Sequence, residues 1–221
     1  ARKLAHEIKN PLTPIQLTID RLKNNYANLL EEKNSINFKE NLIIINNQIR
    51  QIENLVNEFS DFARMPKPIF RENDLIILMN ENVKLLRELD RSIKINVFYN
   101  SERVILKSDK EQLNRVFFNL IKNSIESIKQ KAENLSDFNK NITIELNQVN
   151  DHINLIIIDN GIGFENLEKN IKYILDPYFT TKKNGSGLGL SIVNKIINDH
   201  NGKIKFIPIN DGAKVIVNFI K

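Results

Sequence analysis

The chain has 221 residues, of which 41% are hydrophobic and 27% charged, and it carries a formal net charge of +5 and no cysteine. Such a composition is globular, with room for about one to two domains, and the lack of cysteine excludes disulfides and thiolate metal sites. Basic and acidic residues alternate along the chain, so we expect a mixed, solvated surface and no nucleic-acid partner.

No apolar run approaches the roughly 20 residues that a membrane-spanning helix needs. The chain begins at Ala1, without Met, in a segment with a helical pattern. We therefore expect a soluble, cytoplasmic fragment of a longer protein. Any contact with a membrane would then depend on segments absent from these residues.

The first part of the chain carries two runs of apolar residues spaced alternately three and four apart. They are Ala5, Ile8, Leu12, Ile15, Ile19, Leu22, Tyr26 and Leu29, then Phe38, Leu42, Ile45, Ile49, Ile52, Val56 and Phe59. This spacing predicts packed, coiled-coil-like helices, and the short polar segment at 32–35 predicts an antiparallel hairpin. The hairpin has apolar residues to spare, so we expect a homodimer with a four-helix bundle. The alternative is that the hairpin packs on the rest of its own chain.

Pro66 and Pro68 end the helical pattern, because proline cannot continue a helix and restricts the residue before it. We predict a hairpin domain at 1–65, a linker at 66–73 and a second domain at 74–221.

The second domain alternates between helical and strand patterns. Asp74 can cap a helix over 75–89, and a long helix is predicted over 110–132. Strands are predicted at 93–99, 103–107, 141–149, 152–159, 202–209 and 213–220, with a Gly-rich loop opening a helix within 185–200. The fold class is therefore α+β, a helical hairpin followed by an α/β sandwich.

Two glycine clusters indicate where a ligand could bind. Asp159 ends an apolar strand and is followed by Gly161 and Gly163, which allow close approach of the backbone. In the second cluster, Gly185 to Gly189, free N–H groups before a helix form an anion site. Taken alone, each cluster is more often a tight turn than a ligand site, and neither has the P-loop or Rossmann spacing.

The helix over 110–132 carries Asn119 and Asn123 on one face, four residues apart. Two amide oxygens together with water and phosphate oxygens suit Mg²⁺, which takes few protein ligands. The alternative is a pair of solvent-facing side chains in an Asn-rich protein.

Five segments occur in the order "AHEIKNPLTPIQL", "QLNRVFFNLIKNSIESI", "DNGIGF", "DPYFTTK" and "GSGLGLSIV". Together they resemble the H, N, G1, F and G2 boxes of the sensor histidine kinases over nearly the whole chain. The resemblance implies a dimerisation and phosphoacceptor hairpin followed by an ATP-binding domain of the Bergerat (GHKL) type. The segments "HEIKNPLTPIQL" and "FARMPKP" look most like the NtrY-type nitrogen-regulation branch.

The resemblance also implies roles. His6 would accept the γ-phosphoryl group of ATP, Glu7 would act as general base and Asn10 would serve dephosphorylation of the partner. That partner would be the receiver domain of a response regulator, and the parent protein would be anchored in the bacterial inner membrane. The implied nucleotide-binding residues are Asn119, Asn123, Asp159, Gly161, Gly163, Phe179, Lys182, Gly185, Gly187, Leu188 and Gly189.

Within that set, Asn119 and Asn123 would hold Mg²⁺ and phosphates, and Asp159 would bind the adenine amino group. Phe179 would belong to a mobile lid over 164–184, and Lys182 would reach the phosphates. The sequence departs from the family where Gly-Thr is frequent before the last strand, because here Ala213 follows Gly212. The resemblance therefore gives no support here to a hydroxyl-mediated contact with the adenine-binding Asp159.

The helical register turns His6 outward if Ala5, Ile8 and Leu12 face the bundle core. A neutral imidazole beside a carboxylate can act as a nucleophile near pH 7. Pro11 removes a helical N–H one turn after Glu7, which predicts a bend there.

Two other functions remain open. One is an ATP-hydrolysing conformational machine of the gyrase and Hsp90 type, although Asn119 stands where those proteins place a water-activating Glu. The other is a non-catalytic dimeric signalling module.

Overall fold

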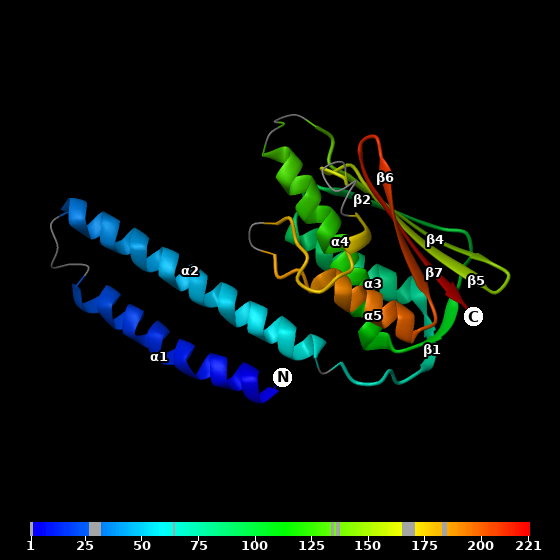
Figure 1. Ribbon diagram of the computed structural model, residues 1–221. Helices are drawn as coiled ribbons and strands as arrows, with labels where there is room; N and C mark the ends of the chain where they lie inside the picture. Colours follow the sequence, from blue (N-terminus) through cyan, green and yellow to red (C-terminus); the bar gives the residue numbers. More distant parts are fainter. Residues whose placement is uncertain are drawn as a thin grey trace. The chain divides into compact units, whose positions relative to one another are not determined.

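The computed structural model describes residues 2–26, 32–63, 65–133, 135, 138–164, 171–182 and 185–221 (Figure 1). By their contacts the residues form two compact units, which we describe separately. The first comprises Ala1–Pro66 with Thr180–Leu188, and the second comprises Lys67–Phe179 with Gly189–Lys221. The expected fold class, a helical hairpin followed by an α/β domain, is confirmed.

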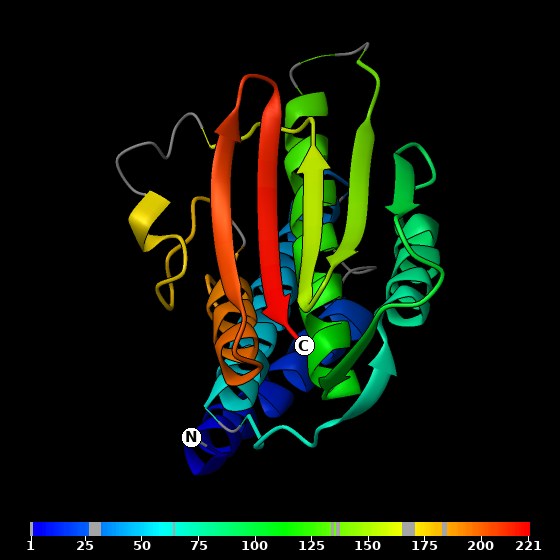
Figure 2. The same cartoon turned by 90° about the vertical axis from the view of Figure 1, so that its right-hand side faces the viewer.

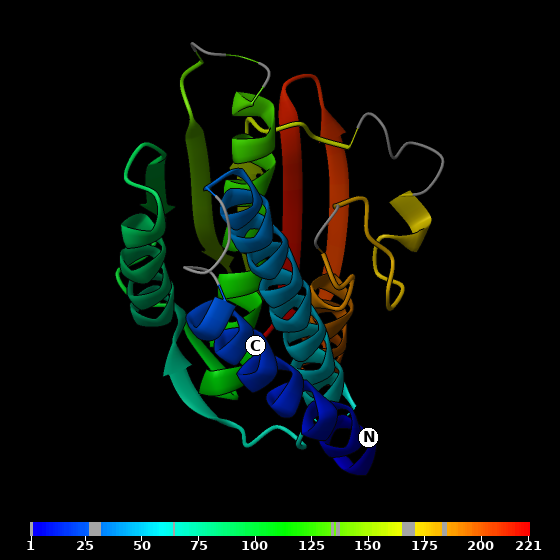
Figure 3. The same ribbon diagram turned by 90° about the vertical axis from the view of Figure 1, so that its left-hand side faces the viewer.

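Helices α1 (Arg2–Tyr26) and α2 (Glu32–Phe62) lie side by side as a hairpin (Figures 1 and 3). Leu12 and Ile19 of α1 form a buried cluster with Leu42 and Ile49 of α2. Helix α1 continues through both of its internal prolines.

In the hairpin, the buried members of the predicted apolar runs are Leu12, Ile19, Leu42, Ile49 and Val56, and most of the other described members are exposed. The intervening residues Ile8, Ile15, Leu22, Ile45 and Ile52 are 36–45% exposed. One partner helix covers only a narrow stripe, so the rest of each apolar face has no cover within the hairpin. The expectation of spare apolar residues is confirmed.

The second unit contains a five-stranded sheet in the order β2-β4-β5-β7-β6. Its strands are β2 (Lys94–Tyr99), β4 (Asn141–Val149), β5 (His152–Asp159), β6 (Lys203–Ile209) and β7 (Gly212–Ile220). Strand β2 is parallel to β4 and all other pairs are antiparallel.

Helices α3 (Leu75–Leu89), α4 (Lys110–Ala132) and α5 (Gly189–Asp199) cover one face of this sheet (Figure 2). The strands follow the alternation that one covered face demands, with Ile153, Leu155 and Ile157 of β5 buried against the helices. Asp159 continues that alternation, so its carboxylate also points to the helical side.

A second sheet pairs β1 (Arg71–Asp74) with β3 (Ile105–Ser108). The first three residues of strand β1 lie in the segment 66–73 that the sequence predicts as linker, and β3 begins two residues later than predicted. The four residues of β1 carry no apolar alternation. The Asn73 side chain instead fixes this strand by donating to the Ser108 carbonyl at 2.8 Å.

The linker before β1 is anchored to the second unit by Asp109. This residue caps α4 by accepting from the Gln112 N–H at 3.1 Å, and its other oxygen accepts from the Ile69 N–H at 2.8 Å. The Asp109 N–H donates to Nε2 of the buried His200 at 3.0 Å, and Phe70 contacts the His200 ring edge-on. Partial burial raises the pKa of Asp109, but the backbone N–H donors outweigh it and the net pKa is lowered.

The lowered pKa of Asp109 predicts acid sensitivity. A carboxylate with a depressed folded pKa stabilises the fold above its unfolded pKa of about 3.9, and the stability is lost as pH falls through the folded value. Asp109→Asn should therefore lower the free energy of unfolding at pH 7 by about 1 kcal/mol, because the amide keeps only one of the two acceptor oxygens, and the difference should shrink below about pH 4.

Urea unfolding at several pH values measures this difference. Asp151→Asn removes a charge from an exposed turn that caps no helix and serves as the control. A difference between wild type and Asp109→Asn that is constant from pH 7 to pH 3 would contradict the assignment.

Candidate active site

Asp159 lies at the end of β5 with only 4% of its surface exposed. One carboxylate oxygen accepts from the Ser124 hydroxyl of α4 at 2.8 Å, and the other accepts from the Gly161 N–H at 3.0 Å. The carboxylate is therefore fixed from two sides, by a helix and by the loop that follows its own strand. The sequence analysis does not name Ser124 as a site residue, and its contact with Asp159 becomes visible only in the structure.

The glycines after Asp159 are required by close packing. A Cβ at Gly161 would lie 2.2 Å from the Ser127 hydroxyl and 2.7 Å from its carbonyl carbon. Gly163 has φ +68°, and a Cβ there would lie 2.4 Å from the Gly212 carbonyl oxygen. The loop thus lies directly against α4 and against the start of β7, and both glycines have a structural reason apart from any ligand.

Asn119 and Asn123 lie one turn apart on α4, and both are partly buried. The Asn119 amide nitrogen donates to the Arg115 carbonyl at 2.8 Å. Its oxygen lies 3.5 Å from the position of a Cβ on Gly189, the first residue of α5. An amide oxygen therefore faces the N-terminus of α5, where free N–H groups favour anions.

The remaining residues of the glycine-rich segment belong to the first unit by their contacts. Lys182 donates its N–H to the Thr180 hydroxyl at 3.1 Å, and a Cβ at Gly185 would lie 2.6 Å from that hydroxyl. Gly187 has φ +70°, and Leu188 is buried. The local geometry explains both glycines without a ligand.

Phe179 is half-buried and donates its N–H to the Asp176 carbonyl at 3.2 Å. The preceding Tyr178 has φ +70°, a conformation that bulky side chains rarely adopt. Within the predicted lid, residues 165–170 and 183–184 lie outside the described residues.

The predicted phosphoacceptor segment lies in α1. His6, Glu7 and Asn10 are all helical, and the Asn10 side chain is exposed. The expected outward orientation of the His6 ring lies outside the described part of the structure, as does the side chain of Glu7.

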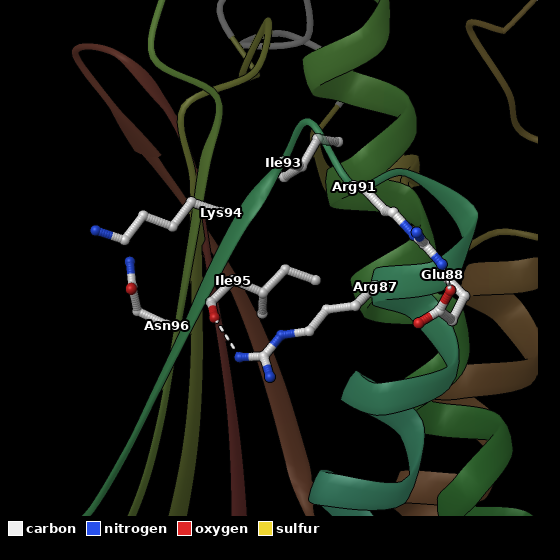
Figure 4. A pocket seen from close by; sticks show the side chains of 7 residues that line it. All are labelled: Arg87, Glu88, Arg91, Ile93, Lys94, Ile95 and Asn96. Atoms are coloured by element: carbon white, nitrogen blue, oxygen red, sulfur yellow. Dashed lines mark hydrogen bonds and ion pairs between the residues drawn. The ribbon is translucent and has the colours of Figure 1, made fainter.

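A pocket of about 420 Å³ lies between α3 and the edge strand β2 (Figure 4). Its basic side chains do not converge on a common point. Arg87 donates to the Ile95 carbonyl at 2.6 Å, Arg91 pairs with Glu88, and Lys94 points away on the other side of the strand. None of its lining residues belongs to the predicted motifs, so we assign it no part in the site.

A metal ion bound among the described residues would need ligands other than a cluster of His, Cys, Asp and Glu side chains. Among the residues that the structure describes, no three His, Cys, Asp or Glu side chains gather in a way that could hold a metal. The Asn119 amide oxygen beside the start of α5 is an oxygen ligand of the kind that Mg²⁺ accepts, together with phosphate oxygens and water.

Comparison with known proteins identifies the family of both parts of the chain. Residues 108–221 match the family described as histidine kinase-, DNA gyrase B- and HSP90-like ATPases, and residues 1–68 match the phospho-acceptor domain His Kinase A. The chain belongs to the sensor histidine kinases.

Two curated relatives of this chain carry NtrY in their descriptions. Nitrogen regulation protein NtrY of Azorhizobium caulinodans is 35% identical over 96% of this chain and 27% of its own length. A sensor histidine kinase described as NtrY-like from Rickettsia bellii is 34% identical over 98% of this chain and 34% of its own length. The chain thus spans about a third or less of these relatives.

A solved structure of histidine kinase ThkA in complex with response regulator TrrA matches the kinase with a TM-score of 0.69 and 27% identity, covering 100% of this chain and 60% of that one. In the described ranges of the kinase, no helix combines the length and apolar character that crossing a membrane requires.

Proposed function

We propose that the chain is the catalytic core of an ATP-dependent protein-histidine autokinase, with His6 as the phosphoacceptor. The observation that carries the proposal is the buried Asp159 carboxylate, held by Ser124 and Gly161 beside an Asn-bearing helix. The family match over both units supports the same assignment.

The adenine amino group would donate to the Asp159 carboxylate, and Gly161 and Gly163 would shape the wall of the base pocket. A buried carboxylate is suited to this role because an ionised carboxylate accepts hydrogen bonds and donates none. The close approach of the loop to α4 supports a pocket of fixed shape.

At the phosphate end, the N-terminus of α5 at Gly189 would bind phosphate oxygens through its free N–H groups. Lys182, Gly185, Gly187 and Leu188 would line the triphosphate when the lid containing Phe179 closes. Asn119 and Asn123 would hold Mg²⁺, which when bound neutralises phosphate charge.

In the proposed reaction, a ring nitrogen of neutral His6 forms a bond to the γ-phosphorus. The bond between that phosphorus and the β–γ bridging oxygen breaks, and ADP leaves with the oxygen. Glu7 would accept a hydrogen bond from the other ring N–H, which fixes the tautomer that attacks, and would take that proton as general base when the bond to phosphorus forms. Asn119 cannot act as a base, which disfavours the ATP-hydrolysing alternative.

The phosphoryl group would then pass to an Asp of a response-regulator receiver domain, as the complex of ThkA with a response regulator suggests. Asn10, exposed on α1 one turn after His6, would position a water for the reverse dephosphorylation. We place this chemistry in the cytoplasm, and we assign anchoring in the inner membrane to segments outside these 221 residues.

The exposed apolar stripe of the hairpin supports a homodimer. Ile15, Leu22, Ile45 and Ile52 continue the spacing of the buried cluster, and the same face of a second copy would cover them.

Incubation with γ-labelled ATP and Mg²⁺ tests the proposal. The expected product is an acid-labile, base-stable phosphoprotein that is absent from His6→Ala and retained in His152→Ala, a matched change at an exposed position of β5. On addition of a receiver domain the label should move to it, and Asn10→Ala should slow its later loss. Label that persists in His6→Ala would refute the assignment.

A further inference from the structure

We propose that Ser124 is the positioning residue for the base-binding carboxylate and supplies from α4 a hydroxyl that the neighbouring strand lacks. The inference rests on the proposed binding of adenine by Asp159. It adds a residue that the motif comparison does not single out.

The register of the sheet places Ala213 directly opposite Asp159 on β7. Directly opposed residues of an antiparallel pair point to the same face, with Cβ atoms about 4.5–5.5 Å apart. Both side chains are buried, with 4% and 5% of their surfaces exposed. A hydroxyl at position 213 would therefore reach the Asp159 carboxylate, but the methyl group of alanine offers no donor.

Ser124 fills this role from the other side of the carboxylate. It is 3% exposed, and its hydroxyl donates to an oxygen of Asp159 at 2.8 Å. It directly follows Asn123, so one turn of α4 orients the carboxylate and also carries an expected phosphate-end residue. Helix α4 would thus carry residues that contact both the base end and the phosphate end of the nucleotide.

A donor to the carboxylate has two physical consequences. It favours the ionised form, which is the form that can accept from the adenine amino group. It also fixes the rotation of the carboxylate, so that binding a nucleotide does not require ordering it. Removing the donor should therefore act on adenine recognition more than on folding.

The test compares Ser124→Ala, Ala213→Thr and the double variant with the wild-type protein. We expect Ser124→Ala to bind ATP roughly tenfold more weakly. Ala213→Thr in the Ser124→Ala background should restore most of that affinity, because the hydroxyl then comes from β7. Affinity is measured by displacement of a fluorescent ATP analogue, and thermal unfolding without nucleotide confirms that each variant folds.

Selectivity for the base separates positioning from a structural role. Guanine presents an oxygen acceptor where adenine presents an amino donor, so Ser124→Ala should lower ATP affinity relative to GTP affinity. Ser108→Ala, which truncates a buried serine of β3, is the matched control and should change neither.

The outcomes distinguish this inference from the proposed function. If the wild-type protein binds no ATP, the proposed function fails and this inference fails with it. If the wild-type protein binds ATP, Asp159→Asn does not, and Ser124→Ala binds as well as wild type, only the positioning role is refuted. Weaker binding without rescue by Ala213→Thr, and with an unchanged ATP-to-GTP ratio, also overturns it.

Discussion

Asp159→Asn should weaken ATP binding by roughly 100-fold or more while the protein stays folded. The substitution removes the charge and can turn an amide donor toward the amino donor of adenine. The Gly161 N–H can still donate to the remaining oxygen, and the Ser124 hydroxyl can rotate to accept from the new amide. Titration calorimetry with ATP and Mg²⁺ measures the loss.

Asp151→Asn is the matched control, because it makes the same chemical change in the exposed turn between β4 and β5. It should bind ATP as the wild-type protein does. Equal affinity of Asp159→Asn and wild type would show that the base is bound elsewhere.

Gly212→Ala should destabilise the second unit by about 3 kcal/mol or more. Gly212 has φ +121°, and a Cβ there would lie 1.8 Å from the Asp159 carbonyl oxygen. Both the conformation and the contact involve backbone, so no side-chain rotation relieves the clash. The start of β7 would have to move away from the end of β5, and we expect ATP affinity to fall together with the melting temperature.

Thermal unfolding measures this effect, with Gly189→Ala as the control. The nearest atom to a Cβ at Gly189 is 3.5 Å away, an ordinary contact at the start of a helix. Its melting temperature should equal or slightly exceed that of the wild-type protein. A Gly212→Ala protein that melts with the wild type would contradict the packing described for this corner of the sheet.

Much of the second unit could be predicted because the apolar residues of its helices and strands are regularly spaced, and capping or turn residues mark where these elements begin and end. The predicted helices 75–89 and 110–132 coincide with α3 and α4, whose first turns Asp74 and Asp109 cap. The predicted strands 141–149 and 152–159 coincide with β4 and β5, and Asn150 has φ 54° in the turn between them.

Other features depend on contacts between residues that lie far apart in the sequence, and no local pattern indicates these contacts. Strand β1 is short and polar, and it becomes a strand only because β3 offers a partner. The contact of Ser124 with Asp159 joins residues 35 positions apart, and the packing of α4 on the sheet brings them together. A serine inside a helix creates no periodic signal, so motif reading identifies Asn123 and misses its neighbour.

The hydrogen bond from the Ile69 N–H to Asp109 also fixes the length of chain that joins α2 to the second unit. Only six residues separate Phe62, the end of α2, from Ile69, and fully extended they reach roughly 25 Å. Two of them are prolines, which stiffen the tether further. A short tether raises the effective concentration of one linked group near another only where its length matches the distance between them. The phosphoryl donor would therefore search a small fixed volume around the hairpin, and the tether length would help decide which histidine lies inside it.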